Sequence, residues 1–322
     1  MTEADYQGFL EKYSEFTFIG KGADNQIIIG MKDLGIGLPG ELRSRDDITL
    51  VKSSEFVMFN DEIEPGENPV YLPFETKSVS LNWPNDFNRK GIWRPAPGGV
   101  SIGHPNVTAG TLGGRVCYPG YGCNCFITNC HVAGCFNKAE IGDSIWQPGR
   151  YDGGSENHDI GKLVLKVKPS QNGTNYVDAA LICDGNTMIY PEIFGIGQVN
   201  TYSTDVFVDL PVRKSGRTSE ITHFKAAATE VCAKVLYRSI DGGATSYYFC
   251  GQILFEGHDT TSLPGDSGSW ILTETDPPIF VSLLFAGNED NQTLGNPAQD
   301  VFDAIPNMYL PGMLVEYNNP YP

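Results

Sequence analysis

The strongest signal in this sequence is the stretch Leu263-Pro-Gly-Asp-Ser-Gly-Ser269, which has the pattern of a serine nucleophile loop. A serine nucleophile needs an oxyanion hole of backbone N–H groups that are already oriented. Gly265 permits the unusual backbone that aims its N–H inward, and the Ser267 N–H would be the second donor. Asp266 would hold the loop from behind. Since a plain Gly-Asp-Ser-Gly turn is the alternative, the motif needs partners elsewhere in the chain.

A candidate general base lies in the segment Phe126-Ile-Thr-Asn-Cys-His-Val-Ala133. An expected strand runs there into His131, which suits a base carried on a rigid element. An ordinary buried histidine is the alternative. With only five histidines in the chain, one at such a strand end is already informative.

The third residue must be a carboxylate that orients the imidazole, and two candidates precede apolar strands. They are Asp159 in NHDIGKLV and Asp178 in NYVDAALIC. We prefer Asp178, because two further strands must be laid down before the chain returns to His131, and Asp159 comes too early. The predicted triad of His131, Asp178 and Ser267 runs in an order that excludes subtilisin-like and α/β-hydrolase enzymes.

FITNCHVAG, VDAALI and LPGDSGSW resemble, in order and spacing, the trypsin/chymotrypsin-like serine peptidases over about residues 108–310. A mostly non-secreted bacterial and plant branch is more closely resembled, through RPAPGGVSIGHPNVTAGTLGG and VSLLFAGN. That branch has an extra amino-terminal region. The resemblance implies a mainly β fold with two antiparallel six-stranded β-barrels and the triad in the cleft between them.

The domain organisation follows from where the pattern changes. Residues 1–98 are expected to be a small α+β region of unknown role, with a polar helix over 1–16, strand-like segments over 25–81 and a linker over 81–99. Residues 99–322 are expected to be the protease domain, because many short segments separated by turn signals indicate a sandwich or barrel. The first barrel would end near residue 190, and residues 299–308 could form a helical turn.

Two departures from the family concern activation and cysteines. No Ile-Val-Gly-Gly sequence is present, so activation by a freed amino terminus is not expected. Lys214-Ser-Gly-Arg-Thr-Ser219 resembles the S-G-R-T-T segment of bacterial members, which implies that Arg217 pairs with Asp266 and supports the site. The family disulfide near the histidine is doubtful, because Cys130 precedes His131 and Cys135 follows at a distance.

The substrate specificity pocket is expected to be formed by residues that precede and follow Ser267 in the sequence. Thr261 stands where trypsin-like enzymes carry the Asp that selects Arg and Lys, so a charged side chain is not favoured. Ser282, Leu283 and Leu284 are expected to form the edge that pairs with the substrate backbone by β-augmentation. Leu284 lies near a position often held by Gly, which would make the pocket shallow and suit a small or medium uncharged side chain.

Composition narrows the partners and the location. The net charge of −17 disfavours nucleic acid and anionic lipid. The amino terminus reads MTEADYQGFLEKYSEF, which is not a secretory signal, and no stretch is apolar enough to span a membrane, so a cytoplasmic location is expected. Buried thiols are the default for the eight cysteines, and neither a metal nor another cofactor is expected. A homo-oligomer remains open.

These observations predict a serine endopeptidase that acts on a protein or peptide through an acyl-enzyme. Ser267 is the expected nucleophile, His131 the general base and Asp178 the residue that fixes its tautomer. A catalytically idle scaffold that binds peptides is one alternative, because fold alone does not give activity. An acyl hydrolase for esters is another.

Overall fold

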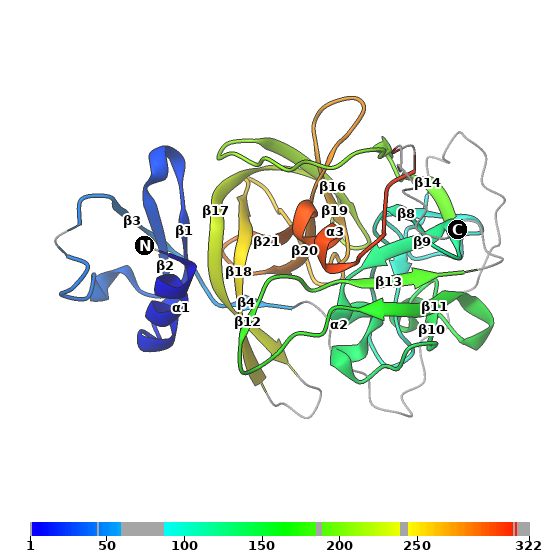
Figure 1. The fold of residues 1–322 in the computed structure, drawn as a ribbon, viewed down its shortest axis with the longest axis horizontal. Coiled ribbons are helices and arrows are strands. Elements are labelled where there is room, and N and C mark those ends of the chain that lie inside the picture. Colours follow the sequence, from blue (N-terminus) through cyan, green and yellow to red (C-terminus); the bar gives the residue numbers. More distant parts are fainter. Residues whose placement is uncertain are drawn as a thin grey trace, which may run out of the picture.

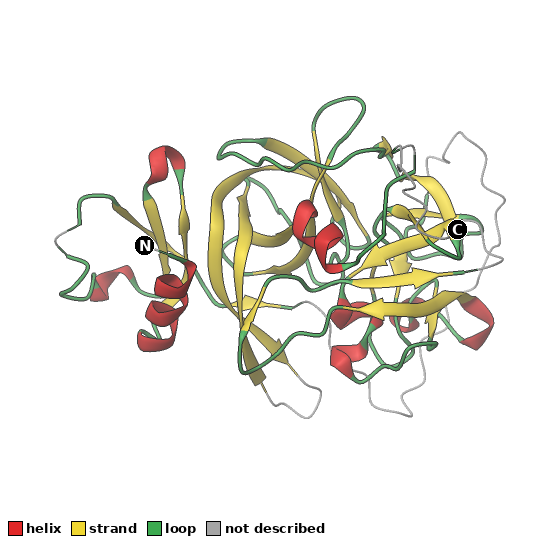
Figure 2. Ribbon diagram, viewed as in Figure 1, coloured by secondary structure: helices red, strands yellow, loops and turns green. Residues whose placement is uncertain are grey.

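The computed structural model describes residues 2–43, 45–58, 87–184, 189–238, 244–311 and 313, and these are mainly β (Figures 1 and 2). Helices are few and short. They are α1 (Glu3–Lys12), α2 (Cys130–Ala133) and α3 (Ala298–Ala304), with 3₁₀ turns at Ala23–Asn25, Leu34–Ile36, Cys135–Asn137, Arg150–Asp152 and Glu156–His158. None of the described helices is long and apolar enough to cross a membrane.

The carboxyl-terminal half contains a ring of six antiparallel strands, as predicted for the second barrel. In pairing order the ring is β16 (Pro211–Gly216), β17 (Glu220–Arg238), β18 (Ala244–Glu256), β21 (Gln292–Pro297), β20 (Phe280–Gly287) and β19 (Trp270–Thr273), which returns to β16. Strand β17 has register shifts between Ala226 and Ala233. Such bulges bend a strand, so β17 can pair with β16 at one end and follow β18 beyond it.

The amino-proximal half of the predicted protease domain is built on a five-stranded antiparallel sheet. Its order is β10 (Ser144–Trp146), β11 (Asp159–Lys166), β13 (Ala180–Cys183), β9 (Gly122–Thr128) and β8 (Arg115–Tyr118). A bridge between Gly103 and Trp146 connects it to the pair β6 (Ser101–Ile102) and β7 (Gly110–Thr111). Strands β5 (Ala96–Gly98), β14 (Ile189–Ile193) and β15 (Gly197–Gln198) form a small mixed sheet.

The two halves share one apolar core, which fixes the position of each against the other. Ile127 and Leu181 of the five-stranded sheet belong to the same buried cluster as Trp270 and Leu283 of the barrel. Each of these side chains is almost completely buried, and a full side chain of this size contributes about 1.5–3 kcal/mol. Residues of the five-stranded sheet that face the barrel are therefore held at fixed distances from the barrel residues opposite them.

The amino-terminal region extends the barrel sheet. Helix α1 begins at a capping box in which Thr2 and Asp5 bond reciprocally. Strand β1 (Phe16–Lys21) pairs antiparallel with β17, and β2 (Ile27–Met31) and β3 (Ile48–Lys52) follow outward (Figure 1). Strand β4 (Phe56–Val57) then reaches β17 and β20, while β12 (Thr174–Asn175) lies beside β18.

The predictions for the ends of the chain have mixed outcomes. The helix near the amino terminus, the strands over 27–31 and 48–52 and the turn of helix near residue 300 are confirmed. The predicted strand over 55–61 is described only to Met58, and residues 59–61 lie outside the described part. The described end of the expected linker is packed, since Trp93 is buried and the Arg89 guanidinium bonds the Ser215 hydroxyl at 2.6 Å. The boundary near residue 98 stays a prediction.

Candidate active site

The structure brings His131 and Asp178 together from neighbouring strands of the five-stranded sheet. Helix α2 starts directly after β9 and carries His131, while Asp178 precedes β13, which pairs with β9. The His131 Nδ1 lies 2.5 Å from Asp178 Oδ2, and the His131 backbone N–H donates to Oδ1 at 3.2 Å. Asp159 instead bonds Lys162 and the Ser144 hydroxyl at the sheet surface.

Further groups fix the Asp178 carboxylate from behind. The Tyr237 hydroxyl donates to Asp178 Oδ2 at 3.3 Å, and the Tyr237 ring stands edge-on to the imidazole at 6.3 Å between centroids. Complete burial raises the pKa of Tyr237, so its hydroxyl stays a donor. Asn129 donates to the Asp178 carbonyl at 2.8 Å, and Asn296 accepts from its N–H at 3.0 Å. The His131–Asp178 pair is therefore held in one orientation.

The Ser267 loop has the backbone that an oxyanion hole requires. Gly265 has a φ of +97°, a conformation that a side chain would strain. No hydrogen bond from the backbone N–H of Gly265 or of Ser267 is found within the described residues. Both N–H groups are therefore available to an incoming oxygen.

One threonine connects the two sides of the site. The Thr111 hydroxyl donates to the Gly265 carbonyl at 2.8 Å, and the Thr111 N–H donates to the Ser267 carbonyl at 2.8 Å. The Thr111 carbonyl in turn accepts from Thr128, at the end of β9 just before His131, at 2.9 Å. A Cβ added at the adjacent Gly110 would lie only 3.0 Å from the Ser267 carbonyl. The loop thus sits directly against the strand end that leads to the histidine.

No hydrogen bond joins the Ser267 hydroxyl to the His131 imidazole among the described residues. The Ser267 hydroxyl donates to the Phe285 carbonyl at 3.4 Å. The His131 Nε2 is buried and has no partner in the described part of the chain. Catalytic hydrogen bonds are often long before substrate binds. Ser267 is 0% and His131 1% exposed, so both groups are closed off from solvent.

The predicted Arg217–Asp266 pair is wrong, because Lys214 of the same segment takes the partner's place. The Lys214 Nζ lies 3.3 Å from Asp266 Oδ2, and both side chains are completely buried. Asp266 also accepts from the backbone N–H groups of Leu263, Thr218 and Ser219 and from the Ser219 hydroxyl. Burial lowers the pKa of Lys214, although the nearby carboxylate opposes this.

Arg217 pairs with Asp152 instead. Its guanidinium binds that carboxylate in a bidentate fashion, with Nε at 2.7 Å from Oδ2 and Nη2 also in contact. Planar forks of this kind suit arginine better than lysine. The β16–β17 turn projects Arg217 away from Asp266, while the backbone N–H of Arg217 still donates to the Thr111 hydroxyl at 3.0 Å. Arg217 therefore contacts the loop through its backbone N–H and through its side chain, which lies against Gly265, and not through Asp266.

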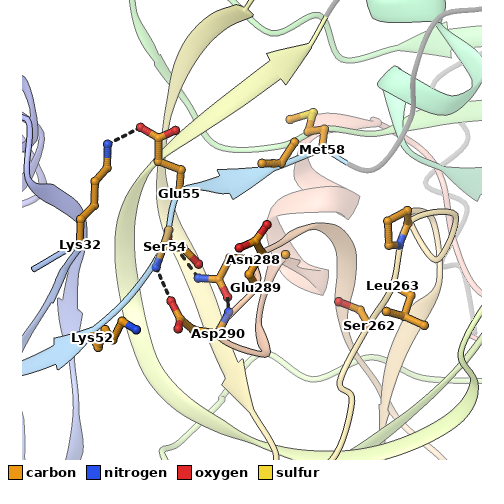
Figure 3. Close-up of a pocket in the computed structure, with 13 residues that line it drawn as sticks. Lys32, Lys52, Ser54, Glu55, Met58, Ser262, Leu263, Asn288, Glu289 and Asp290 are labelled. Carbon is orange, nitrogen blue, oxygen red and sulfur yellow. Dashed lines mark hydrogen bonds and ion pairs between the residues drawn. The ribbon is translucent and has the colours of Figure 1, made fainter.

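The residues predicted to form the substrate pocket are only partly in place. Ser282 and Leu283 pair with strands on both sides and are completely buried, as is Leu284, so they form no free edge. Thr261 is buried too and bonds the Asn291 carbonyl at 3.0 Å and the Thr293 hydroxyl at 2.8 Å. The cavity beside the loop has a volume of about 770 Å³ and is lined instead by Ser262, Leu263, Pro264 and residues 287–290 (Figure 3).

The cysteines are mostly paired, which overturns the expectation of buried free thiols for six of them. The disulfides join Cys117 to Cys123, Cys125 to Cys183 and Cys232 to Cys250, while Cys130 and Cys135 are free and buried. Disulfides persist in oxidising surroundings. The expected cytoplasmic location stays a prediction. Within the described ranges no cluster of His, Cys, Asp and Glu could hold a metal ion.

Sequence reasoning missed several residues of the site. Lys214 lies within the quoted Lys214–Ser219 segment, so its charge was a visible signal that the family resemblance assigned to Arg217. Asn129 stands two residues before His131 and could have been noticed. Tyr237 and Thr111 carry no local signal, because only the pairing of distant strands brings them to the site.

Similarity to known proteins is found among solved structures. No family model and no curated protein sequence matches the chain. Solved structures that resemble it include bacterial serine proteases. Chymotrypsin of Cellulomonas bogoriensis is 18% identical, with 68% of this chain and 99% of that chain covered and a TM-score of 0.46. The Nocardiopsis protease NAPase and protease A of Thermobifida fusca are each 17% identical, with 66% of this chain and 97% of the other chain covered. Their TM-scores are 0.45 and 0.46.

Proposed function

We propose that this protein is a serine endopeptidase with Ser267 as nucleophile, His131 as general base and Asp178 as orienting carboxylate. The single observation that carries the proposal is the His131–Asp178 pair at 2.5 Å, with the far imidazole nitrogen buried and without a partner among the described residues. A histidine held by a carboxylate on one nitrogen can accept a proton on the other.

The proposed reaction has two half-steps. The Ser267 hydroxyl oxygen attacks the scissile carbonyl while His131 Nε2 takes its proton, and the oxyanion is held by the N–H groups of Gly265 and Ser267. His131 then returns the proton to the leaving amine, which leaves an acyl-enzyme. Water attacks the ester by the same route in reverse order, which releases the acid and restores Ser267.

The peptide-binding scaffold remains the second candidate, and one observation favours it. The Ser267 hydroxyl is turned toward Phe285 and both catalytic groups are buried, as they would be in an inactive protein. An acyl hydrolase for esters shares all the groups named above, so it differs only in the substrate accepted.

Covalent labelling tests the proposal. We expect a fluorophosphonate probe to modify the protein, and Ser267→Ala to abolish labelling while its circular dichroism stays unchanged. The loss in kcat should be about 10⁶-fold, as for the removal of other triad nucleophiles. Wild-type turnover by the variant would refute the assignment. A peptide library assayed beside simple esters then separates an endopeptidase from an esterase.

A further inference from the structure

Strand β20 has a free edge that begins beside the nucleophile. Up to Leu284 the strand is flanked by β21 on one side and by β19 or the Ser269 backbone on the other. Beyond it, Ala286 and Gly287 pair only with β21 within the barrel. The Phe285 carbonyl accepts from the Ser267 hydroxyl, so this edge starts at the reacting group. An extended peptide that adds to residues 285–287 would run past Ser267.

Strand β4 of the amino-terminal region already occupies this edge. Val57 pairs with Gly287 in the antiparallel sense, and on its other side β4 runs parallel to β17, with Phe56 opposite Val235. The Met58 N–H donates to the Leu236 carbonyl at 3.2 Å. A short strand from outside the barrel therefore fills the gap between β17 and the free end of β20 (Figure 1).

Polar contacts hold the same segment against the β20–β21 hairpin. The Ser53 hydroxyl donates to Gln292 Oε1 at 2.7 Å, and the Ser54 N–H donates to Asp290 Oδ2 at 2.5 Å. Asn288 Nδ2 bonds both the Ser53 hydroxyl at 3.2 Å and the Ser54 carbonyl at 3.3 Å. Figure 3 shows the contacts of Ser54 with Asn288 and Asp290. Each partner on the hairpin lies within five residues of Gly287, so these contacts set the register of β4.

The segment also lines the cavity beside the catalytic loop. Val57 and Met58 line it opposite Ser262, Leu263 and Pro264, the residues that lead into Gly265 (Figure 3). Met58 is 2% exposed and belongs to the same apolar cluster as Tyr237 and Phe285. The amino-terminal segment therefore forms one wall of the cavity that a substrate would enter.

We propose that residues 53–58 keep the enzyme latent by occupying the β20 edge on which substrate must pair, and that the site opens when this segment is displaced. The inference rests on the proposed function. A tethered segment competes at an effective concentration on the order of millimolar, so a free peptide of similar affinity cannot replace it at lower concentrations. No new amino terminus is needed, because Lys214 already neutralises Asp266.

Two proline variants test the proposal in the full chain. Val57→Pro removes an N–H from a strand with neighbours on both sides, where proline is not tolerated. We expect fluorophosphonate labelling of Ser267 to become on the order of tenfold faster or more, since the competent state becomes populated. Thr49→Pro is the matched control, because Thr49 is exposed on β3, at the outer edge of the sheet, and should label at the wild-type rate.

A milder variant guards against misfolding. Ser53→Ala removes two contacts to the hairpin without a backbone change and should accelerate labelling in the same direction by a smaller factor, about twofold to tenfold. Circular dichroism checks that each variant is folded. Folded Val57→Pro and Ser53→Ala proteins that label no faster than wild type would overturn the proposal.

Peptide binding separates this inference from the protease assignment. A fluorescein-labelled peptide of residues 52–58 is added to Ser267→Ala and to Ser267→Ala/Val57→Pro, neither of which needs to be active. Binding to the double variant alone supports the occupied edge even if no variant is ever labelled. Binding to both variants alike, or to neither, contradicts it whatever the labelling shows.

Discussion

The histidine side and the serine side of the site each bury one aspartate completely, but only the aspartate on the serine side is paired with a lysine. On the histidine side Asp178 is bonded by His131 and Tyr237, and no lysine or arginine of the described ranges forms an ion pair with it. On the serine side Asp266 has Lys214 and three backbone N–H groups around it. Because Lys214 neutralises Asp266, that carboxylate serves to hold the Ser267 loop. Asp178 has no such cation, so it can stabilise the positive charge that forms on His131 when the imidazole takes a proton.

The largest effect should follow from removing the charge on the histidine side. Asp178→Asn should lower kcat about 10⁴-fold at neutral pH, because an amide favours the wrong imidazole tautomer. Steady-state kinetics with a peptide substrate, in the Val57→Pro background in which residues 53–58 are displaced, would measure this loss of kcat. Asp159→Asn is the control, since Asp159 makes a partly exposed ion pair with Lys162 and local hydrogen bonds to Ser144 and Gly161, and it should change kcat/KM less than about threefold. A larger effect for Asp159 would reverse the two assignments.

Removing the cation on the serine side should affect stability as well as rate. Lys214→Met leaves the Asp266 charge buried without its partner, which typically costs about 3–5 kcal/mol. Urea unfolding should show this loss, with a lower rate of labelling in the folded fraction. Arg217→Met should destabilise through Asp152 while leaving labelling of the folded protein much closer to wild type. Equal effects of the two variants on labelling would argue that Arg217 also acts on the loop.

A smaller effect is expected from the hydroxyl that supports Asp178. Tyr237→Phe removes a single hydrogen bond, which corresponds to ~1 kcal/mol or about a fivefold lower kcat. Because Tyr237 acts through Asp178, kcat should fall while KM stays unchanged. Tyr247→Phe changes the ring that packs on Tyr237, at 4.4 Å between centroids, and should leave kcat unaltered. A change confined to KM in Tyr237→Phe would contradict a positioning role.

The smallest effect concerns a thiol on the histidine side. Burial raises the pKa of Cys130, and the negative charge of Asp178 raises it further. Since the thiolate is the reactive form, we expect Cys130 to resist iodoacetamide in the folded protein at pH 8. In denaturant without reductant, mass spectrometry should find two alkylated cysteines, and eight after reduction. Rapid alkylation in the native state would mean that this side of the site is neither closed nor negatively charged.

Local sequence predicts those parts of the site that lie on one short segment. The Gly265–Ser267 loop depends on a glycine with positive φ, and a strand that runs into His131 is visible as an apolar segment. The β character follows from many short apolar segments with turn signals between them, whereas the six-stranded barrel was implied only by the family resemblance. The choice of Asp178 over Asp159 needed only the order in which strands are laid down.

The tertiary structure decided everything that depends on which strand lies beside which. The edge of β20 that β19 leaves unpaired begins at Phe285 and not at Ser282, because β19 starts only at Trp270, opposite Leu283. The β20 sequence itself carries no signal for where β19 starts. The partner of Asp266 is Lys214 and not Arg217, because the β16–β17 turn directs one side chain inward and the other toward Asp152. The occupation of the β20 edge by Val57 joins residues more than two hundred positions apart. Sequence patterns report the local preferences of a segment, whereas such pairings depend on packing between segments that are remote in the chain.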